Sequence, residues 1–152
     1  MQRSHSIGES FVSGLAGAAA LTLVHETARR ILPDAPRMDR LGRRVISRSM
    51  EGLGVEPPHR NTLQGMALAG DLVSNTLYYS LVGAGRGTSL VRGAALGAAA
   101  GLGALVVPPL LGLGRRAQGR TNKTKAMTFS WYLLGGLAAA ATLACIERWN
   151  DK

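Results

Sequence analysis

The sequence predicts an all-α integral membrane protein, a bundle of four transmembrane helices with a basic amphipathic helix at the membrane surface between the first two. Apolar residues and charges are separated in blocks, and neither residues 94–114 nor residues 126–146 contain a charged side chain. A helix of about 20 such residues crosses a hydrocarbon core of about 30 Å. The net charge of +9 points the same way, because the basic residues gather beside the apolar blocks.

The first span is predicted over residues 7–31 of a 152-residue chain that, by its length, forms one domain. Its apolar body is followed by a polar cluster, and Pro33 stops the helix. This is the weakest of the four spans, because Glu9 and His25–Glu26 fall in its outer turns. Glu9 also interrupts what would be the apolar core of a signal peptide, so we expect this span to be retained.

A basic amphipathic helix is predicted over residues 35–53. Asp34 can cap it, and Pro36 in the first turn is a favourable start. Apolar residues recur on one face at helical spacing, which suits a helix lying in the membrane interface. The alternative is a solvated basic linker. The polar face carries the arginines that we expect to contact anionic lipid headgroups: Arg37, Arg40, Arg43, Arg44 and Arg48.

The remaining spans are predicted at residues 61–84, 89–114 and 126–148. The glycines of residues 83–87 indicate a tight turn between two helices. A nucleotide-binding loop is excluded because no strand pattern precedes them. Pro108–Pro109 should kink the third span. Aromatic residues are expected to anchor the fourth span at the two interfaces: Trp131, Tyr132 and Trp149.

The distribution of positive charge predicts the orientation, because cytoplasmic loops carry the excess of Lys and Arg. One side would hold Arg29, Arg30, Arg37, Arg40, Arg43, Arg44, Arg48, Arg60, Arg115, Arg116, Arg120, Lys123 and Lys125. The other would hold Arg3, Arg86, Arg92, Arg148 and Lys152. We therefore expect a multi-pass protein of the bacterial inner (plasma) membrane, with both termini outside and the first and third loops in the cytoplasm.

Small residues at every fourth position predict close helix packing. Gly93, Gly97 and Gly101 share one face of the third span, and Gly136 and Ala140 offer the same spacing in the fourth. Such stripes let two backbones approach each other in lipid. The stripe could pack within one chain or between copies in a homo-oligomer, and we favour packing within the chain.

A polar face is predicted inside the second span. Gln64, Asp71, Asn75 and Tyr78 follow one another at spacings of 7, 4 and 3 residues, which places them on one side of a helix. Asp71 lies roughly 16 Å along the helix from Arg60, close to the middle of a membrane. A carboxylate there usually faces a protein interior or a pathway. Holding the bundle in register is the expected role, and a proton or cation site is the alternative.

A second polar cluster, formed by His25, Glu26 and Arg29, is expected near the cytoplasmic interface. If the first two spans are antiparallel, His25 lies opposite Gln64 rather than Asp71. The segment 25–29 begins like the HExxH zinc motif, but Arg29 replaces the second histidine, which excludes that metal site. A snorkelling polar cap is the simpler interpretation, and a binding site is the alternative.

No catalytic residue, cofactor site or metal site is predicted. Cys145 is the only cysteine, so a disulfide within the chain is excluded. Nucleic acid is not an expected partner, because the basic residues flank apolar spans and few aromatics accompany them. The expected partners are membrane lipids, chiefly anionic headgroups, and a protein partner or a second copy.

Three functions follow from these features. The leading hypothesis is a non-enzymatic scaffold, accessory subunit or homo-oligomer, based on the small-residue stripes and the basic helix. The alternative is a small transporter or channel with a polar pathway around Asp71. The third is a membrane enzyme or lipid-headgroup binder.

Overall fold

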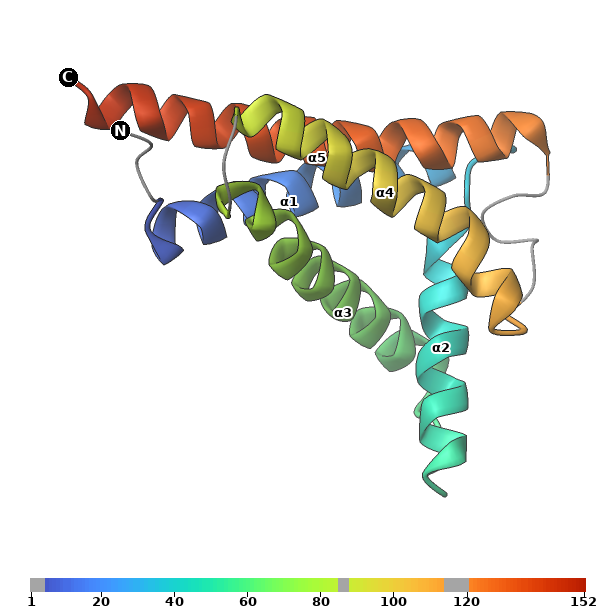
Figure 1. Ribbon diagram of the computed structural model, residues 1–152. Coiled ribbons are helices and arrows are strands. Elements are labelled where there is room, and N and C mark those ends of the chain that lie inside the picture. The colour runs from blue at the N-terminus through green and yellow to red at the C-terminus, as the bar shows by residue number, and fades with distance from the viewer. Residues whose placement is uncertain (1–4, 85–87, 114–120) are drawn as a thin grey trace.

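The computed structural model describes residues 5–84, 88–113 and 121–152, and in those residues it is all helical, without a strand (Figure 1). The predicted all-α class is therefore confirmed. Predictions for Arg3, Gly85–Gly87, Gly114 and the basic residues of loop three up to Arg120 lie outside the described residues. The helices are α1 (Ile7–Ile31), α2 (Met38–Gly52), α3 (Arg60–Ser80), the short 3-10 helix η1 (Leu81–Gly83), α4 (Ser89–Leu110) and α5 (Asn122–Asn150).

Three helices are long and apolar enough to cross a membrane: α1, α4 and α5. Most of their apolar length is not covered by the rest of the protein, and large side chains such as Leu23, Leu102 and Val106 are exposed. The predicted second span, residues 61–84, forms the helix α3 but is not in this set. It is long enough, at 21 residues, but Gln64, Asp71 and other polar residues make it too polar by composition.

The helix α5 organises the fold by packing against both α1 and α4 (Figure 1). It is antiparallel to each of them, so α1 and α4 run in the same direction. The C-terminal part of α3 packs along α1, and the N-terminal part of α3 tilts away from α1. The helix α2 lies crosswise against the N-terminal part of α3. We call the end that holds the C-termini of α1 and α4 and the N-termini of α3 and α5 the basic end. The N-terminus of α1 and the C-terminus of α5 lie at the opposite end.

The contact between α4 and α5 is made through glycine. Gly93, Gly97 and Gly101 are all buried in this contact. A Cβ atom at Gly97 would lie 2.7 Å from the Cα of Leu133, and one at Gly101 would lie 3.0 Å from the Cα of Phe129. Backbone meets backbone here, as small residues allow. Gly93 lies against the other two residues predicted for this packing, Gly136 and Ala140.

Beside this contact, α1, α3 and α5 share a buried core around Tyr79. The Tyr79 hydroxyl donates a 2.7 Å hydrogen bond to the carbonyl of Tyr132. On α1, a Cβ atom at Gly17 would lie 2.6 Å from the carbonyl oxygen of Gly135, so these two helices also approach closely. Leu21 fills the remaining space and is fully buried.

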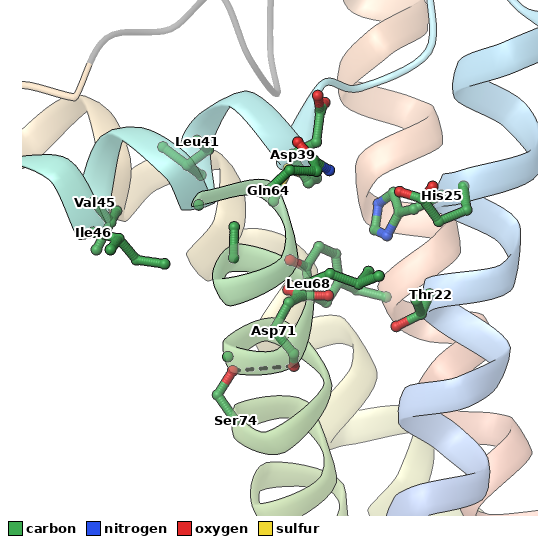
Figure 2. Close-up of a pocket in the computed structure, with 16 residues that line it drawn as sticks. Thr22, His25, Asp39, Leu41, Val45, Ile46, Gln64, Leu68, Asp71 and Ser74 are labelled. Carbon is green, nitrogen blue, oxygen red and sulfur yellow. Dashed lines mark hydrogen bonds between the residues drawn. The ribbon is translucent and has the colours of Figure 1, made fainter. Parts of the chain in front are cut away.

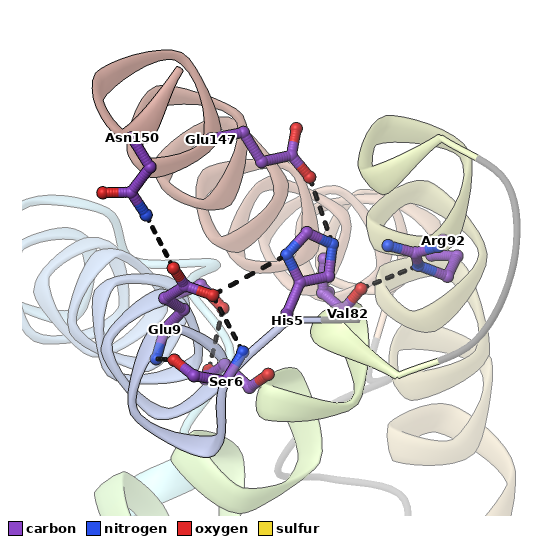
Figure 3. A network of polar contacts seen from close by, with 9 residues as sticks. His5, Ser6, Glu9, Val82, Arg92, Glu147 and Asn150 are labelled. Carbon is purple, nitrogen blue, oxygen red and sulfur yellow. Dashed lines mark hydrogen bonds and ion pairs between the residues drawn. The ribbon is translucent and has the colours of Figure 1, made fainter. Parts of the chain in front are cut away.

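Glu9, which weakens the first span in the sequence, is part of the start of α1. The backbone N–H of Glu9 donates to the Ser6 hydroxyl at 3.1 Å, and the Glu9 carboxylate accepts from the Ser6 N–H at 2.8 Å. This reciprocal pair is a capping box. Figure 3 shows the same carboxylate accepting from Asn150 of α5, with His5 beside Glu147. Polar groups thus join α1 to α5 at the end that holds both termini.

The amphipathic helix begins later than predicted. It starts at Met38 rather than near residue 35, and Asp34 does not cap it. Asp34 instead pairs with Lys123 at 3.4 Å, and its carbonyl accepts from the Thr124 hydroxyl. Because this segment is held against the start of α5, and Pro36 is buried there, the helix cannot begin before it.

The prolines of α4 end the helix rather than kinking its second half. Pro108 and Pro109 lie in its last turn, and the helix stops at Leu110, not at Gly114. Gly112 has a φ of +68°, and the N–H of Leu113 donates to the carbonyl of Pro108 at 2.9 Å. This left-handed glycine with its reverse hydrogen bonds is a Schellman motif, a regular helix terminator.

Candidate functional site: a polar pocket between α1, α2 and α3

The divergence of α3 from α1 leaves a pocket of about 340 Å³ near the basic end, closed on one side by α2 (Figure 2). Tyr132 of α5 forms its floor. The polar lining comes from all three surrounding helices: Thr22, His25 and Glu26 on α1, Asp39 on α2, and Gln64, Asp71 and Ser74 on α3. The volume falls in the range of pockets that take small molecules, which runs from about 300 to 1,000 Å³.

The α1 wall of the pocket is formed by His25. Its side chain is buried, with 7 % of the residue exposed, and its ring is held edge-on by two aromatic rings of α5. The ring centroid lies 5.2 Å from that of Trp131 and 5.7 Å from that of Tyr132. Edge-on contacts of this kind fix the orientation of a ring. Figure 2 shows the imidazole of His25 pointing into the space between α1 and α3.

Three buried polar atoms on the pocket wall have no hydrogen-bond partner among the described residues: the Thr22 hydroxyl oxygen, Nε2 of His25 and Oδ1 of Asp39. They come from two helices and all belong to residues that line the one cavity. Buried polar groups in native proteins are nearly always hydrogen-bonded, and each exception asks for an explanation. These atoms have almost no accessible surface, so a polar molecule in the pocket would reach them only if their side chains turn toward it.

The α3 wall is formed by Asp71, which Asn75 orients. The Asn75 amide donates to Oδ1 of Asp71 at 3.0 Å and to its backbone carbonyl at 2.8 Å. Ser74 donates to the same carbonyl at 3.1 Å. Tyr78 does not join this group, because its hydroxyl donates to the Leu96 carbonyl of α4 at 2.9 Å. The face predicted on this helix is therefore divided between the pocket and the contact with α4.

Glu26 is the second carboxylate of the pocket, and arginines of its own helix neutralise it. Nε of Arg29 donates to Glu26 at 2.8 Å, and Arg30 lies at 3.9 Å. Arg29 itself does not line the pocket. The predicted cluster of His25, Glu26 and Arg29 thus consists of an ion pair at the rim and a histidine that faces inward.

The α2 wall adds Asp39, which the sequence did not single out. It pairs with Arg43 of the next turn at 3.4 Å, and the guanidinium of Arg43 also donates to Gln64 of α3. The apolar face of α2 turns toward the same cavity, where Leu41 and Val45 line it. The periodicity of α2 revealed its two faces but not that the apolar one covers a pocket.

Three of the five arginines predicted to contact lipid headgroups make contacts within the chain. Besides Arg43, Arg44 donates to the carbonyl of Leu113, and Arg48 donates to the carbonyl of Gly112 at 3.1 Å. These carbonyls belong to the C-terminal cap of α4, where the helix dipole favours positive charge. Arg40 is exposed and Arg37 is half-buried.

The structure brings together residues that the sequence assigned to two separate clusters. His25, Glu26, Gln64 and Asp71 line one cavity, although no hydrogen bond joins His25 to Asp71 in the described residues. Thr22 and Asp39 were missed. The only signal for Asp39 was its position four residues before Arg43, a spacing that also fits an ordinary surface ion pair.

The chemistry of the lining suits binding of a polar molecule. No group of three or more His, Cys, Asp or Glu in the described part of the chain is arranged to hold a metal ion. Comparison of the chain with models of protein families, with curated proteins and with solved structures finds no match. A function is therefore inferred from the residues of the pocket.

Proposed function

We propose that this chain is a four-span membrane protein that binds a small molecule in the pocket between α1, α2 and α3. The observation that carries the proposal is a cavity of ligand size whose lining residues include three with an unpartnered buried polar atom: Thr22, His25 and Asp39. Unpaired buried polar groups destabilise a fold. Their concentration around one space of ligand size is a feature of binding sites.

The direction of the helices supports four spans. Because α1 and α4 run in the same direction, a chain that crosses the membrane in both must return between them. The helix α3 makes that return, from the basic end to the end near η1. Large apolar side chains face outward on it, with Val73 and Leu77 about 60 % exposed. Asn75 is buried and Gln64 and Asp71 are half-buried, as expected of polar residues inside a membrane.

The placement of positive charge supports the predicted orientation. Basic residues such as Arg30, Arg60 and Lys125 lie at the basic end, which the positive-inside rule assigns to the cytoplasm. The pocket would then lie in the cytoplasmic half of the membrane. Access from the cytoplasm would pass α2.

The competing proposal is assembly as a scaffold, accessory subunit or homo-oligomer. Its main motive in the sequence was the glycine stripe of α4, and those glycines lie against α5 of the same chain. The stripe is therefore not a free surface for a second copy. Headgroup binding by α2 is less well supported, because three of its five arginines donate hydrogen bonds within the chain.

The proposal is tested by blocking the pocket. Leu68 lines the cavity from α3 and is 40 % exposed, whereas Val73 lies on the same helix, does not line the cavity and is 59 % exposed. The wild type, Leu68→Trp and Val73→Trp would be purified in native-lipid nanodiscs, and bound small molecules identified by mass spectrometry. A stoichiometric molecule should be present in the wild type and in Val73→Trp and absent from Leu68→Trp.

Two results would contradict the proposal. One is that none of the three proteins retains a small molecule, and the other is that Leu68→Trp retains as much as the wild type. Native mass spectrometry of the same samples tests the competing proposal. A foreign subunit bound in equal amounts to all three proteins would favour an accessory role.

A further inference from the structure

We propose that the ligand of this pocket is an organic cation with a single positive charge, a protonated amine on a small apolar body, and that Asp71 is its counter-ion. The inference rests on the proposed function and names the class of ligand. It follows from the charge balance of the lining, from the hydrogen-bonding capacity of the unpartnered atoms, and from the apolar part of the wall.

The charge balance leaves one carboxylate uncompensated. Glu26 is paired with arginines of α1, and Asp39 with Arg43 of α2. Asp71 has no ion-pair partner in the part of the chain that the structure describes, and its carboxylate accepts a hydrogen bond only from the neutral Asn75. A lone carboxylate inside a membrane is unfavourable unless a cation or a proton joins it. One positive charge in the pocket would therefore balance the charge of its lining.

All three unpartnered atoms can accept a hydrogen bond. Oδ1 of Asp39 can only accept, and Nε2 of His25 accepts in one of the two neutral tautomers of imidazole. The Thr22 hydroxyl both donates and accepts. An ammonium group has N–H donors and no acceptor, so it suits the acceptors of this lining once their side chains turn toward it, whereas a carboxylate or phosphate would face acceptors and like charge. A protonated amine therefore fits better than a quaternary ammonium ion, which has no N–H.

The remaining wall calls for an apolar body on the amine. A bare inorganic cation does not suit the site, because it needs several oxygen ligands in a tight shell and the described residues show no such cluster. The volume of about 340 Å³ also leaves space for a molecule larger than an ion. Away from the carboxylates, the wall is formed by Met38, Leu41, Val45, Ile46, Ala67 and Leu68.

The test uses three probes of one shape: 4-phenylbutylamine, 4-phenylbutanol and 4-phenylbutyrate. They share an apolar body and carry a cationic, neutral or anionic head. Binding would be measured by titration calorimetry on the full chain in nanodiscs of neutral phosphatidylcholine, with empty nanodiscs subtracted. The wild type would be compared with Asp71→Asn, and with Glu51→Gln as the matched control, because Glu51 is an exposed carboxylate of α2 outside the pocket.

We expect the amine to bind the wild type and Glu51→Gln equally, and Asp71→Asn about tenfold more weakly, because the charge-assisted hydrogen bond is lost. The alcohol and the carboxylate should bind all three proteins weakly. His25→Phe keeps an aromatic ring between Trp131 and Tyr132 but removes Nε2. It should weaken amine binding by a smaller factor than Asp71→Asn.

Different results separate this inference from the proposed function. Equal binding of the alcohol or the carboxylate would overturn the cation class while leaving a binding pocket. Equal binding of the amine to the wild type and Asp71→Asn would also overturn the inference. If no probe binds but the purified protein retains a small molecule of another class, only the inference fails. If no probe binds and nothing is retained, both fail.

Discussion

Two helix contacts differ in how far their small residues continue. One joins α4 to α5, and the other joins α1 to α3. Along α4, glycine recurs at positions 93, 97 and 101, and the two backbones stay close over the whole contact. Along α1, small residues also begin the contact, where a Cβ atom at Gly14 would lie 2.6 Å from the backbone nitrogen of Ser80. Toward the basic end, His25 takes the place of a small residue.

This difference accounts for the pocket between α1 and α3. A helix face of small residues lets its neighbour come close, since membrane helices pack through shape. A face that changes from small to large forces its neighbour to tilt. The helix α3 tilts away from α1 where the larger residues begin, and the space is lined by polar groups instead of being filled (Figure 2).

The largest effect is expected from breaking the close α4–α5 contact. Gly97→Val should destabilise the protein by about 3 kcal/mol, because the added side chain meets the backbone of Leu133. Gly103→Val is the matched control on the same helix, because a Cβ atom there meets nothing within 4 Å. Unfolding of both variants in mixed micelles would be followed by circular dichroism. Equal stability would show that the glycine contact is not important for the fold.

Next in size is the attachment of α2, the cover of the pocket. Replacing both Arg44 and Arg48 with alanine removes their hydrogen bonds to the carbonyls that end α4. We expect the free energy of opening α2 to fall by about 2 kcal/mol, because hydrogen bonds to charged groups contribute about 1.5–3 kcal/mol. Hydrogen exchange of the α2 amides measures this directly. Arg40→Ala, an exposed position on the same helix, should leave the exchange rates unchanged.

A smaller effect is expected in the core where α1, α3 and α5 meet. Tyr79→Phe removes the hydrogen bond to the Tyr132 carbonyl and should cost about 1 kcal/mol. Tyr78→Phe removes a similar bond to Leu96 at a half-buried position, so a smaller loss is expected. Thermal unfolding of the two variants would reveal the order. A larger loss for Tyr78→Phe would contradict the packing described for this core.

The smallest expected effect is a stabilisation, whereas the variants above should destabilise the protein. Thr22→Val replaces an unpartnered buried hydroxyl with a methyl group, so it should stabilise the empty protein by about 0.5 kcal/mol. Thr76→Val is the control, because that hydroxyl donates to the Leu72 carbonyl at 2.7 Å and its loss should destabilise. An unpartnered hydroxyl beside an empty binding pocket lowers the stability of the protein locally. Thermal unfolding without ligand checks the signs, and destabilisation by Thr22→Val would argue that the hydroxyl is satisfied.

Much of the helical order could be predicted from the sequence, because uncharged blocks and helical periodicity are local properties. The bounds of α1 agree with the prediction, and α4 and α5 differ by a few residues at their ends. The errors came from contacts between distant segments. Asp34 was expected to cap α2, but the start of α5 holds it elsewhere. Glu9 was interpreted as a weakness, although its spacing from Ser6 is itself a start signal.

The candidate site was less accessible to sequence reasoning. His25 and Asp71 were noted as unusual polar residues, but a level antiparallel pairing of straight helices placed them apart. The tilt of α3 and the crosswise position of α2 put both on one cavity, and neither feature is a local property of the chain. Asp39 was hidden for the same reason, since in sequence it is one more charge on an amphipathic helix.

The most direct test of the account is whether the pocket is a polar space inside the membrane. Leu68 lines it while 40 % exposed, and Val73, 59 % exposed on the same helix, does not line it. Single-cysteine variants Leu68→Cys and Val73→Cys, made with Cys145 replaced by alanine, would be placed in sealed vesicles and treated with a small, positively charged thiol reagent. A polar pocket at this place predicts rapid modification of Leu68→Cys and little of Val73→Cys. Equal rates at the two positions, or faster modification of Val73→Cys, would contradict it.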